Sequence, residues 1–142
     1  MIKNAGTGDL EMLSAYLSEE VYGKAILTAI EAYGFDEKFQ TVYIDVEDGE
    51  CKGVYLYLYR SLFLYSSTNK IEIDFLEQMS GFAVPELVAG RKDNVNIVSW
   101  LLTEHEMETG AEMPVPTDRE GKPVECLASF TEGGNEWAVL RG

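Results

Sequence analysis

Four tyrosines lie close together in the middle of the chain, and their side chains could line a groove for a small ligand. Three alternate along one apolar stretch, and the fourth follows shortly after: Tyr55, Tyr57, Tyr59 and Tyr65. A tyrosine joins an apolar ring to a hydroxyl that can donate or accept a hydrogen bond, which suits an organic ligand. The alternative is that the rings pack across neighbouring strands beneath a helix, which is the commoner role of such a pattern.

Two basic residues stand where a helix is predicted to begin. Arg91 and Lys92 directly follow Gly90. The first backbone N–H groups of a helix have no partner inside the helix, so a helix start can bind an anion. The same pattern is also typical of a solvated helix start that binds nothing. We therefore hold Arg91 and Lys92 as anion-binding candidates, with the solvated cap as the alternative.

The only histidine, His105, stands between Glu104 and Glu106. An imidazole beside carboxylates can act as a general base near neutral pH. No serine or cysteine nucleophile can be placed beside it from the sequence, so we interpret His105 as a solvated residue. The neighbouring acidic residues alternate along a predicted strand instead of converging from a loop, which argues against a cation site. We predict no metal and assign no catalytic residue.

Hydrophobic periodicity predicts the elements that must hold these residues. A helical period covers the first part of the chain, a period of two covers the middle, and both recur later. The Asp48-Gly49 pair is a strong signal for a two-residue hairpin turn. The predicted elements are a strand at 1–4, a helix beginning near Asp9, a helix at 20–33, strands at 42–47, 51–59 and 62–65 with a turn at Arg60-Ser61, a helix at 74–80, a strand at 85–89, a helix at 91–102, and strands at 104–108, 124–130 and 136–140.

This order predicts the α+β fold class, with a mixed, largely antiparallel sheet flanked by helices on both faces. Helices before and after the central strands would cover both faces, which explains a strand with leucine on one face and tyrosine on the other. We predict a single domain over residues 1–142. Its main α/β core would span 1–110, and 111–142 would form a loop plus a C-terminal hairpin that turns at Gly133-Gly134-Asn135.

Composition narrows the classes of partner. The chain has 25 acidic and 11 basic residues, and its formal net charge is −14. Nucleic acids and anionic membrane surfaces are bound through lysine and arginine, so we expect no nucleic-acid partner and no membrane partner. Cys51 and Cys126 lie far apart, and the sequence has no signal peptide or long apolar run. We therefore predict free thiols and a cytoplasmic location.

Several short runs carry a resemblance to a known family. They are Tyr16-Leu17-Ser18-Glu19-Glu20, Ala29-Ile30-Glu31-Ala32-Tyr33-Gly34-Phe35-Asp36, Phe39-Gln40-Thr41-Val42-Tyr43, Gly53-Val54, Tyr57-Leu58-Tyr59, Leu64-Tyr65-Ser66 and Val88-Ala89-Gly90-Arg91-Lys92. Together, over about residues 8–102, they resemble the N-terminal, non-CoA-binding half of bacterial GNAT-family N-acetyltransferases. In those longer relatives a second module carries the CoA-binding loop. The resemblance implies a GNAT-like fold for this chain.

The segment 65–71 lies where the order of elements would put a loop for the CoA pyrophosphate. Such a loop needs free backbone N–H groups and usually glycine, because the backbone must approach the phosphate closely. There is no glycine between Gly53 and Gly81. The Arg/Gln-x-x-Gly-x-Gly/Ala loop of the family has no counterpart here, so no CoA-binding residue is carried over.

We therefore expect an acetyltransferase-related, GNAT-like domain that has no CoA binding and no cofactor and serves as a binding or assembly module. The alternative is an active N-acetyltransferase that transfers acetyl from acetyl-CoA to an amine, for which the resemblance implies a tyrosine as general acid. An assembly role implies a homodimer or a partner acetyltransferase module. The surface for such an assembly would be formed by the apolar residues of the predicted terminal hairpin, which are Phe130, Trp137, Val139 and Leu140. The alternative is that these residues close the sheet of their own domain.

Overall fold

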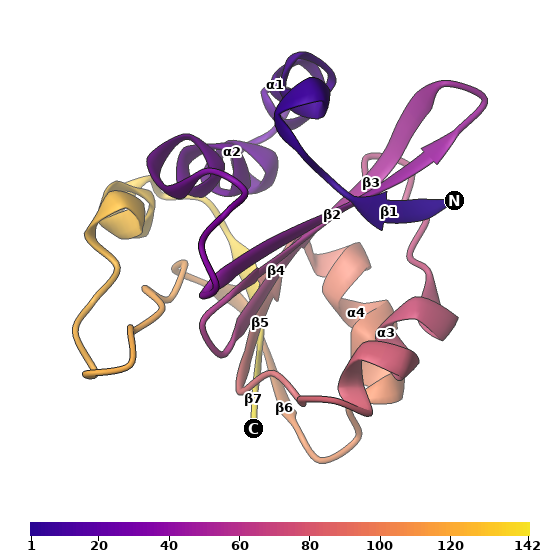
Figure 1. The fold of residues 1–142 in the computed structure, drawn as a ribbon. Helices are drawn as coiled ribbons and strands as arrows, with labels where there is room; N and C mark the ends of the chain where they lie inside the picture. The colour runs from indigo at the N-terminus through magenta and orange to yellow at the C-terminus, as the bar shows by residue number, and fades with distance from the viewer.

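A seven-stranded sheet runs through the protein in the computed structural model, which describes residues 1–142 except for the side chain of Glu132 (Figure 1). The strand order is β1-β2-β3-β4-β5-β7-β6. Strands β4 and β5 pair in parallel, and the other neighbouring strands pair antiparallel. The strands are β1 (Ile2–Asn4), β2 (Gln40–Glu47), β3 (Glu50–Leu58), β4 (Ser61–Tyr65), β5 (Leu87–Gly90), β6 (Glu106–Ala111) and β7 (Trp137–Arg141).

Helices cover both faces of this sheet, so the predicted α+β class and its mixed, largely antiparallel sheet are confirmed (Figure 1). One face is covered by α1, α2 and η2, and the other by α3 and α4. The helices are η1 (Thr7–Asp9), α1 (Leu10–Leu17), α2 (Val21–Tyr33), α3 (Ile73–Ser80), α4 (Lys92–Leu101) and the 3₁₀ helix η2 (Glu125–Glu132). No helix of the described residues is long and apolar enough to span a bilayer.

The pair α1–α2 is joined so tightly that one position must be glycine. A Cβ on Gly23, in the first turn of α2, would collide with the backbone of Leu17 at the end of α1. Ile26, Ala29 and Ile30 then form the buried stripe of α2. The helix ends at Gly34, whose φ of 72° is the left-handed conformation that glycine adopts without strain.

The central strands follow the predicted alternation, with one correction at a turn. Val54, Leu56 and Leu58 face α1 and α2, and the Asp48-Gly49 turn joins β2 to β3. The next turn is Tyr59-Arg60, not Arg60-Ser61. Because Tyr59 is a turn residue with φ 53°, its ring leaves the face of Tyr55 and packs on the α1–α2 side.

The predicted C-terminal hairpin is wrong. Residues 125–132 form the 3₁₀ helix η2, and β7 is inserted between β5 and β6. Val124, Leu127 and Phe130 are spaced by three residues, which is the period of a 3₁₀ helix, and they pack into the core beside α2. Trp137, Val139 and Leu140 are buried inside the chain's own sheet, so they close that sheet and offer no assembly surface.

Candidate functional site

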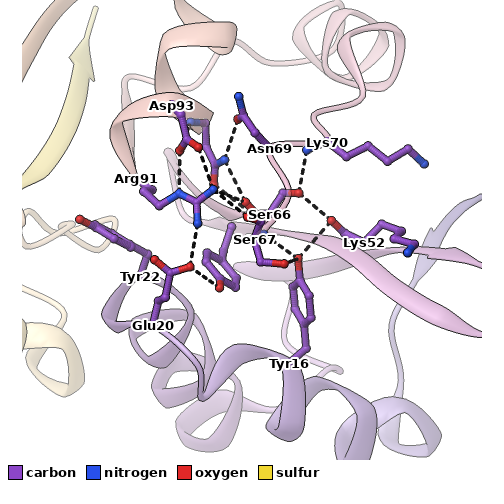
Figure 2. A network of polar contacts seen from close by, with 12 residues as sticks. Tyr16, Glu20, Tyr22, Lys52, Ser66, Ser67, Asn69, Lys70, Arg91 and Asp93 are labelled. Atoms are coloured by element: carbon purple, nitrogen blue, oxygen red, sulfur yellow. Dashed lines mark hydrogen bonds and ion pairs between the residues drawn. The ribbon is translucent and has the colours of Figure 1, made fainter.

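Strands β4 and β5 separate at their carboxyl ends, and a network of polar side chains fills the gap between them (Figure 2). Their pairing runs from Ser61 and Leu87 to Leu64 and Gly90, and the chains then diverge. Gly90 allows the close approach just before this point, because a Cβ there would lie 2.8 Å from the carbonyl oxygen of Leu64. Loop 66–72 leads from β4 to α3, and Arg91 leads from β5 to α4.

Arg91 lies at the centre of the gap with its donors engaged by the protein. Its Nη1 donates to Glu20 at 2.7 Å, and Nε and Nη2 form a two-pronged pair with Asp93, also at 2.7 Å (Figure 2). Nη2 also donates to the carbonyl oxygens of Ser66 and Ser67 at 2.9 and 3.1 Å. The hydrogen bonds to Asp93 are the main cause that raises the pKa of Arg91, and the same bonds lower the pKa of Asp93.

The other anion-binding candidate is not part of this network. Lys92 is exposed on the first turn of α4, whereas Arg91 is turned toward the gap. Two carboxylates already balance the charge of Arg91, and its guanidinium lies 5.8 Å from the centre of the Tyr65 ring. The gap therefore presents no unbalanced positive charge from Arg91 to an incoming phosphate.

Asn94 links helix α4 to the end of β4 through hydrogen bonds. Its side chain is fully buried. The amide oxygen accepts the backbone N–H of Ser66 at 2.9 Å, and the amide nitrogen donates to the Ser66 carbonyl at 3.1 Å and to Asn69 at 2.9 Å. A buried amide with both ends satisfied fixes the backbone that it binds.

Tyr16, on α1, fastens the same loop from the other side. Its hydroxyl accepts the backbone N–H of Ser67 at 2.8 Å and donates to the Lys52 carbonyl at 3.1 Å. The Ser66 hydroxyl accepts the N–H of Lys70 at 2.8 Å and also donates to the Lys52 carbonyl. Both contacts tie the loop to β3, as the dashed lines in Figure 2 show.

The loop therefore has few backbone donors left for a ligand. Five of the seven N–H groups in residues 66–72 donate to other groups of the chain: those of Ser66, Ser67, Asn69, Lys70 and Glu72. A phosphate-binding loop needs these donors free and directed outward. Most of the backbone donors that a phosphate would need in this loop are therefore already used by the chain itself.

The four predicted tyrosines are in three different places. Tyr65 is in the network: its hydroxyl donates to Glu20 at 2.6 Å, and burial raises its pKa. Tyr55 lies under α3, where its ring contacts Phe75, its hydroxyl accepts the N–H of Glu72, and burial raises its pKa to about 12. Tyr57 and Tyr59 lie toward the opposite end of the sheet.

A cluster of three carboxylates beside the loop contains a lysine where a cation would bind. Asp45, Glu47 and Glu72 lie close enough to share an ion. The Lys70 ammonium contacts all three, at 3.3 Å from Asp45 and 3.4 Å from Glu72, and its hydrogen bond to Glu47 is the main cause of its raised pKa. We assign no metal to this cluster.

Sequence reasoning missed the residues that complete the network. Glu20 and Tyr16 carry no local signal, because their partners are distant in sequence, whereas Asp93 lies two residues from its partner Arg91. Asn94 does carry one: it lies four residues before the buried Val98, on the inward face of an amphipathic helix. A polar residue on such a face must find a hydrogen-bond partner, which is the signal that could have identified it.

Comparison with known proteins gives a distant structural likeness. No protein-family model and no curated protein matches the chain. Among solved structures, it is similar to an acetyltransferase of the GNAT family from Streptococcus pneumoniae, with 10% identity, 99% of this chain and 96% of that chain covered, and a TM-score of 0.48. It is also similar to a ribosomal-protein-alanine N-acetyltransferase from Brucella melitensis, with 12% identity, 100% and 98% covered, and a TM-score of 0.48.

Proposed function

We propose that this chain is an acetyltransferase-related, GNAT-like domain that does not bind acetyl-CoA and serves as a binding module. The observation that carries the proposal is the closed β4–β5 gap. Arg91 and Asn94 occupy the backbone groups of Ser66 and Ser67 at the end of β4. A cofactor that needs those groups would first have to displace a buried amide and a paired guanidinium.

Three further features support the absence of CoA binding. Most backbone donors of loop 66–72 are engaged, the loop has no glycine, and the carboxylates of Asp45, Glu47 and Glu72 stand beside it. The formal net charge of −14 also opposes a ligand with several phosphates. Since three of the four residues of the expected assembly surface, Trp137, Val139 and Leu140, are buried in the chain's own sheet, the binding role is the better supported of the two module roles.

Titration with acetyl-CoA at low salt tests the proposal, with the backbone amide signals of residues 66–72 as the reporter in a nitrogen–proton NMR spectrum. We expect these signals not to move, and we expect no saturable heat from the gap in calorimetry. The amides of α2, on the covered side of the sheet, serve as the internal reference. Saturable shifts of the 66–72 amides with a micromolar Kd would overturn the proposal and favour the active N-acetyltransferase instead.

A further inference from the structure

A cavity lies at the other end of the sheet, where β2 begins and the β3–β4 turn is made. It has a volume of about 420 Å³, and an adjoining depression of about 620 Å³ shares several of its walls. Its principal walls are Lys38, Phe39, Tyr57, Tyr59, Arg60 and Arg119. The segment leading to η2, orange in Figure 1, passes beside this end of the sheet and brings Arg119 to it.

This cavity is separate from the β4–β5 gap. It lies at the beginning of β4, beside Arg60, whereas the gap lies at the end of β4, after Tyr65. A strand advances about 3.3 Å per residue, so β4 puts roughly 15 Å between the two places. Two of the tyrosines that the sequence marked as ligand-groove candidates, Tyr57 and Tyr59, line this cavity.

The wall of the cavity is basic in a strongly acidic protein. Lys38, Arg60 and Arg119 are three of the 11 basic residues of the chain, and Asp118 is the one carboxylate lining the same cavity. Asp118 accepts the backbone N–H groups of Glu120 and of Lys122, so it is held by its own turn. The cavity itself therefore has more positive than negative groups, whereas the adjoining depression adds Asp36, Glu37 and Glu120 against Lys122.

The cations of this wall are available to a ligand. Among the described residues, Lys38 and Arg119 take part in no ion pair within 4 Å. Arg60 is 3.4 Å from Glu86, but the two side chains are 61% and 65% exposed. Such an exposed pair contributes little to stability, so Arg60 can exchange it for a ligand anion.

The same wall carries a pair of stacked aromatic rings. The rings of Phe39 and Tyr59 are stacked, with centroids 4.8 Å apart and planes only 9° apart. Tyr59 has a φ of 53°, a conformation that is strained for a non-glycine residue. Glycine would relieve this strain, so the Tyr59 ring is present here at a cost in backbone conformation. The Tyr59 N–H donates to the Phe39 carbonyl at 2.8 Å and holds the stack in place.

We propose that this cavity binds a small organic anion with a planar ring, its phosphate or carboxylate on Arg119 and Lys38 and its ring against Phe39 and Tyr59. Guanidinium groups pair with both kinds of anion in a two-pronged geometry. The volume falls in the usual range of small-molecule sites, about 300–1,000 Å³. The inference identifies a ligand class for the binding role, but its site and its evidence do not depend on the state of the β4–β5 gap.

The test is an NMR and calorimetric titration of the full chain with four probes. These are 5′-AMP and benzoate, which combine a ring with an anion, adenosine, which has the ring alone, and inorganic phosphate, which has the anion alone. We expect 5′-AMP, benzoate or both to shift the amides of Phe39, Tyr59 and Arg119, and to bind at least about tenfold more tightly than adenosine or phosphate. Comparing 5′-AMP with benzoate tells a phosphate ligand from a carboxylate ligand.

Matched variants make the test specific. Arg119→Gln should weaken binding of the preferred probe by about tenfold or more. Lys24→Gln, which makes the same charge change at an exposed site on α2, should leave it unchanged. Tyr59→Gly removes the ring while easing the backbone, so it should weaken binding in a folded protein. Equal binding by Arg119→Gln and Lys24→Gln, or no shift of the cavity amides with either ring-bearing anion, would overturn the proposal.

One further arm separates this inference from the proposed function. Acetyl-CoA itself carries an adenine ring and phosphate groups, so any heat that it produces must be assigned either to the cavity or to the gap. Heat with acetyl-CoA that is lost in Arg119→Gln belongs to the cavity and supports the inference. Heat that persists in Arg119→Gln and shifts the amides of residues 66–72 belongs to the gap and counts against the proposed absence of CoA binding there.

Discussion

Among the residues that line the gap, we expect the removal of Arg91 to lower the free energy of unfolding the most. Arg91→Ala would remove the arginine partner of Glu20 and Asp93 and its hydrogen bonds to the carbonyl oxygens of Ser66 and Ser67. Since the arginine side chain is still 20% exposed, water would replace part of these contacts. We expect a loss of about 1–3 kcal/mol in the free energy of unfolding, measured by urea denaturation.

The neighbouring lysine is the matched control for this change. Lys92 is exposed and contributes no ion pair within the described residues. The free energy of unfolding of the Lys92→Ala variant should therefore stay within about 0.5 kcal/mol of that of the unaltered protein. Equal losses in the two variants would mean that Arg91 contributes nothing through its contacts.

The pair Arg91–Asp93 also predicts a pH dependence with a definite sign. Hydrogen bonds from Arg91 lower the pKa of Asp93 below its ordinary value of 3.8. A carboxylate with a lowered folded-state pKa adds stability that is present above the unfolded-state pKa and is lost as the pH falls through the folded-state pKa. The unfolding free energy lost in Asp93→Asn should thus be constant above about pH 5 and shrink below about pH 4. A loss that does not change with pH would contradict this assignment.

At the scale of the element, helix α4 positions the end of β4 through Asn94. Asn94→Leu would leave the buried N–H of Ser66 without a partner, at a cost of about 1–3 kcal/mol, whereas the Ser66 carbonyl would keep its hydrogen bond from Arg91. Hydrogen exchange at the Ser66 amide should also accelerate. Asn96→Leu, at an exposed position of the same helix, is the control and should change neither measurement. Unchanged exchange at Ser66 in Asn94→Leu would show that other contacts hold this strand.

Local patterns explain which elements could be predicted from the sequence. The Asp48-Gly49 turn and the β2–β4 meander follow from turn chemistry and a period of two, and both are present. The strand predicted at 124–130 is wrong because Val124, Leu127 and Phe130 also fit the period of three of a 3₁₀ helix. Only packing against α2 decides between a strand and a 3₁₀ helix here. The β4–β5 gap could be located from the order of elements, but its closure depends on Tyr16, Glu20 and Asn94. These contacts join residues that no local pattern connects.

At the scale of the whole molecule, β7 joins the edge strand β6 to the rest of the sheet. It pairs with β5 on one side and β6 on the other, and Val139 is fully buried opposite Glu108. Val139→Asp would put an unpaired charge into the core, and we expect loss of cooperative unfolding, followed by circular dichroism. Glu108→Ala, at the exposed partner position in the register, should unfold like the unaltered chain. A folded Val139→Asp protein would contradict this placement of β7.

The net charge of the whole chain makes a last prediction, in which stability and ligand binding respond to salt in opposite directions. With 25 acidic and 11 basic residues, the folded chain repels itself, and added salt screens that repulsion. The urea midpoint should therefore rise between about 0.01 M and 0.15 M sodium chloride, over which the Debye length falls from about 30 Å to about 8 Å.

Binding of 5′-AMP to Lys38, Arg60 and Arg119 should weaken over the same range of salt, because the salt screens the attraction between these cations and the phosphate. A midpoint that falls with salt would mean that local pairs such as Arg91–Asp93 outweigh the general repulsion. Salt-independent binding would mean that the ring, and not the charge, holds the ligand.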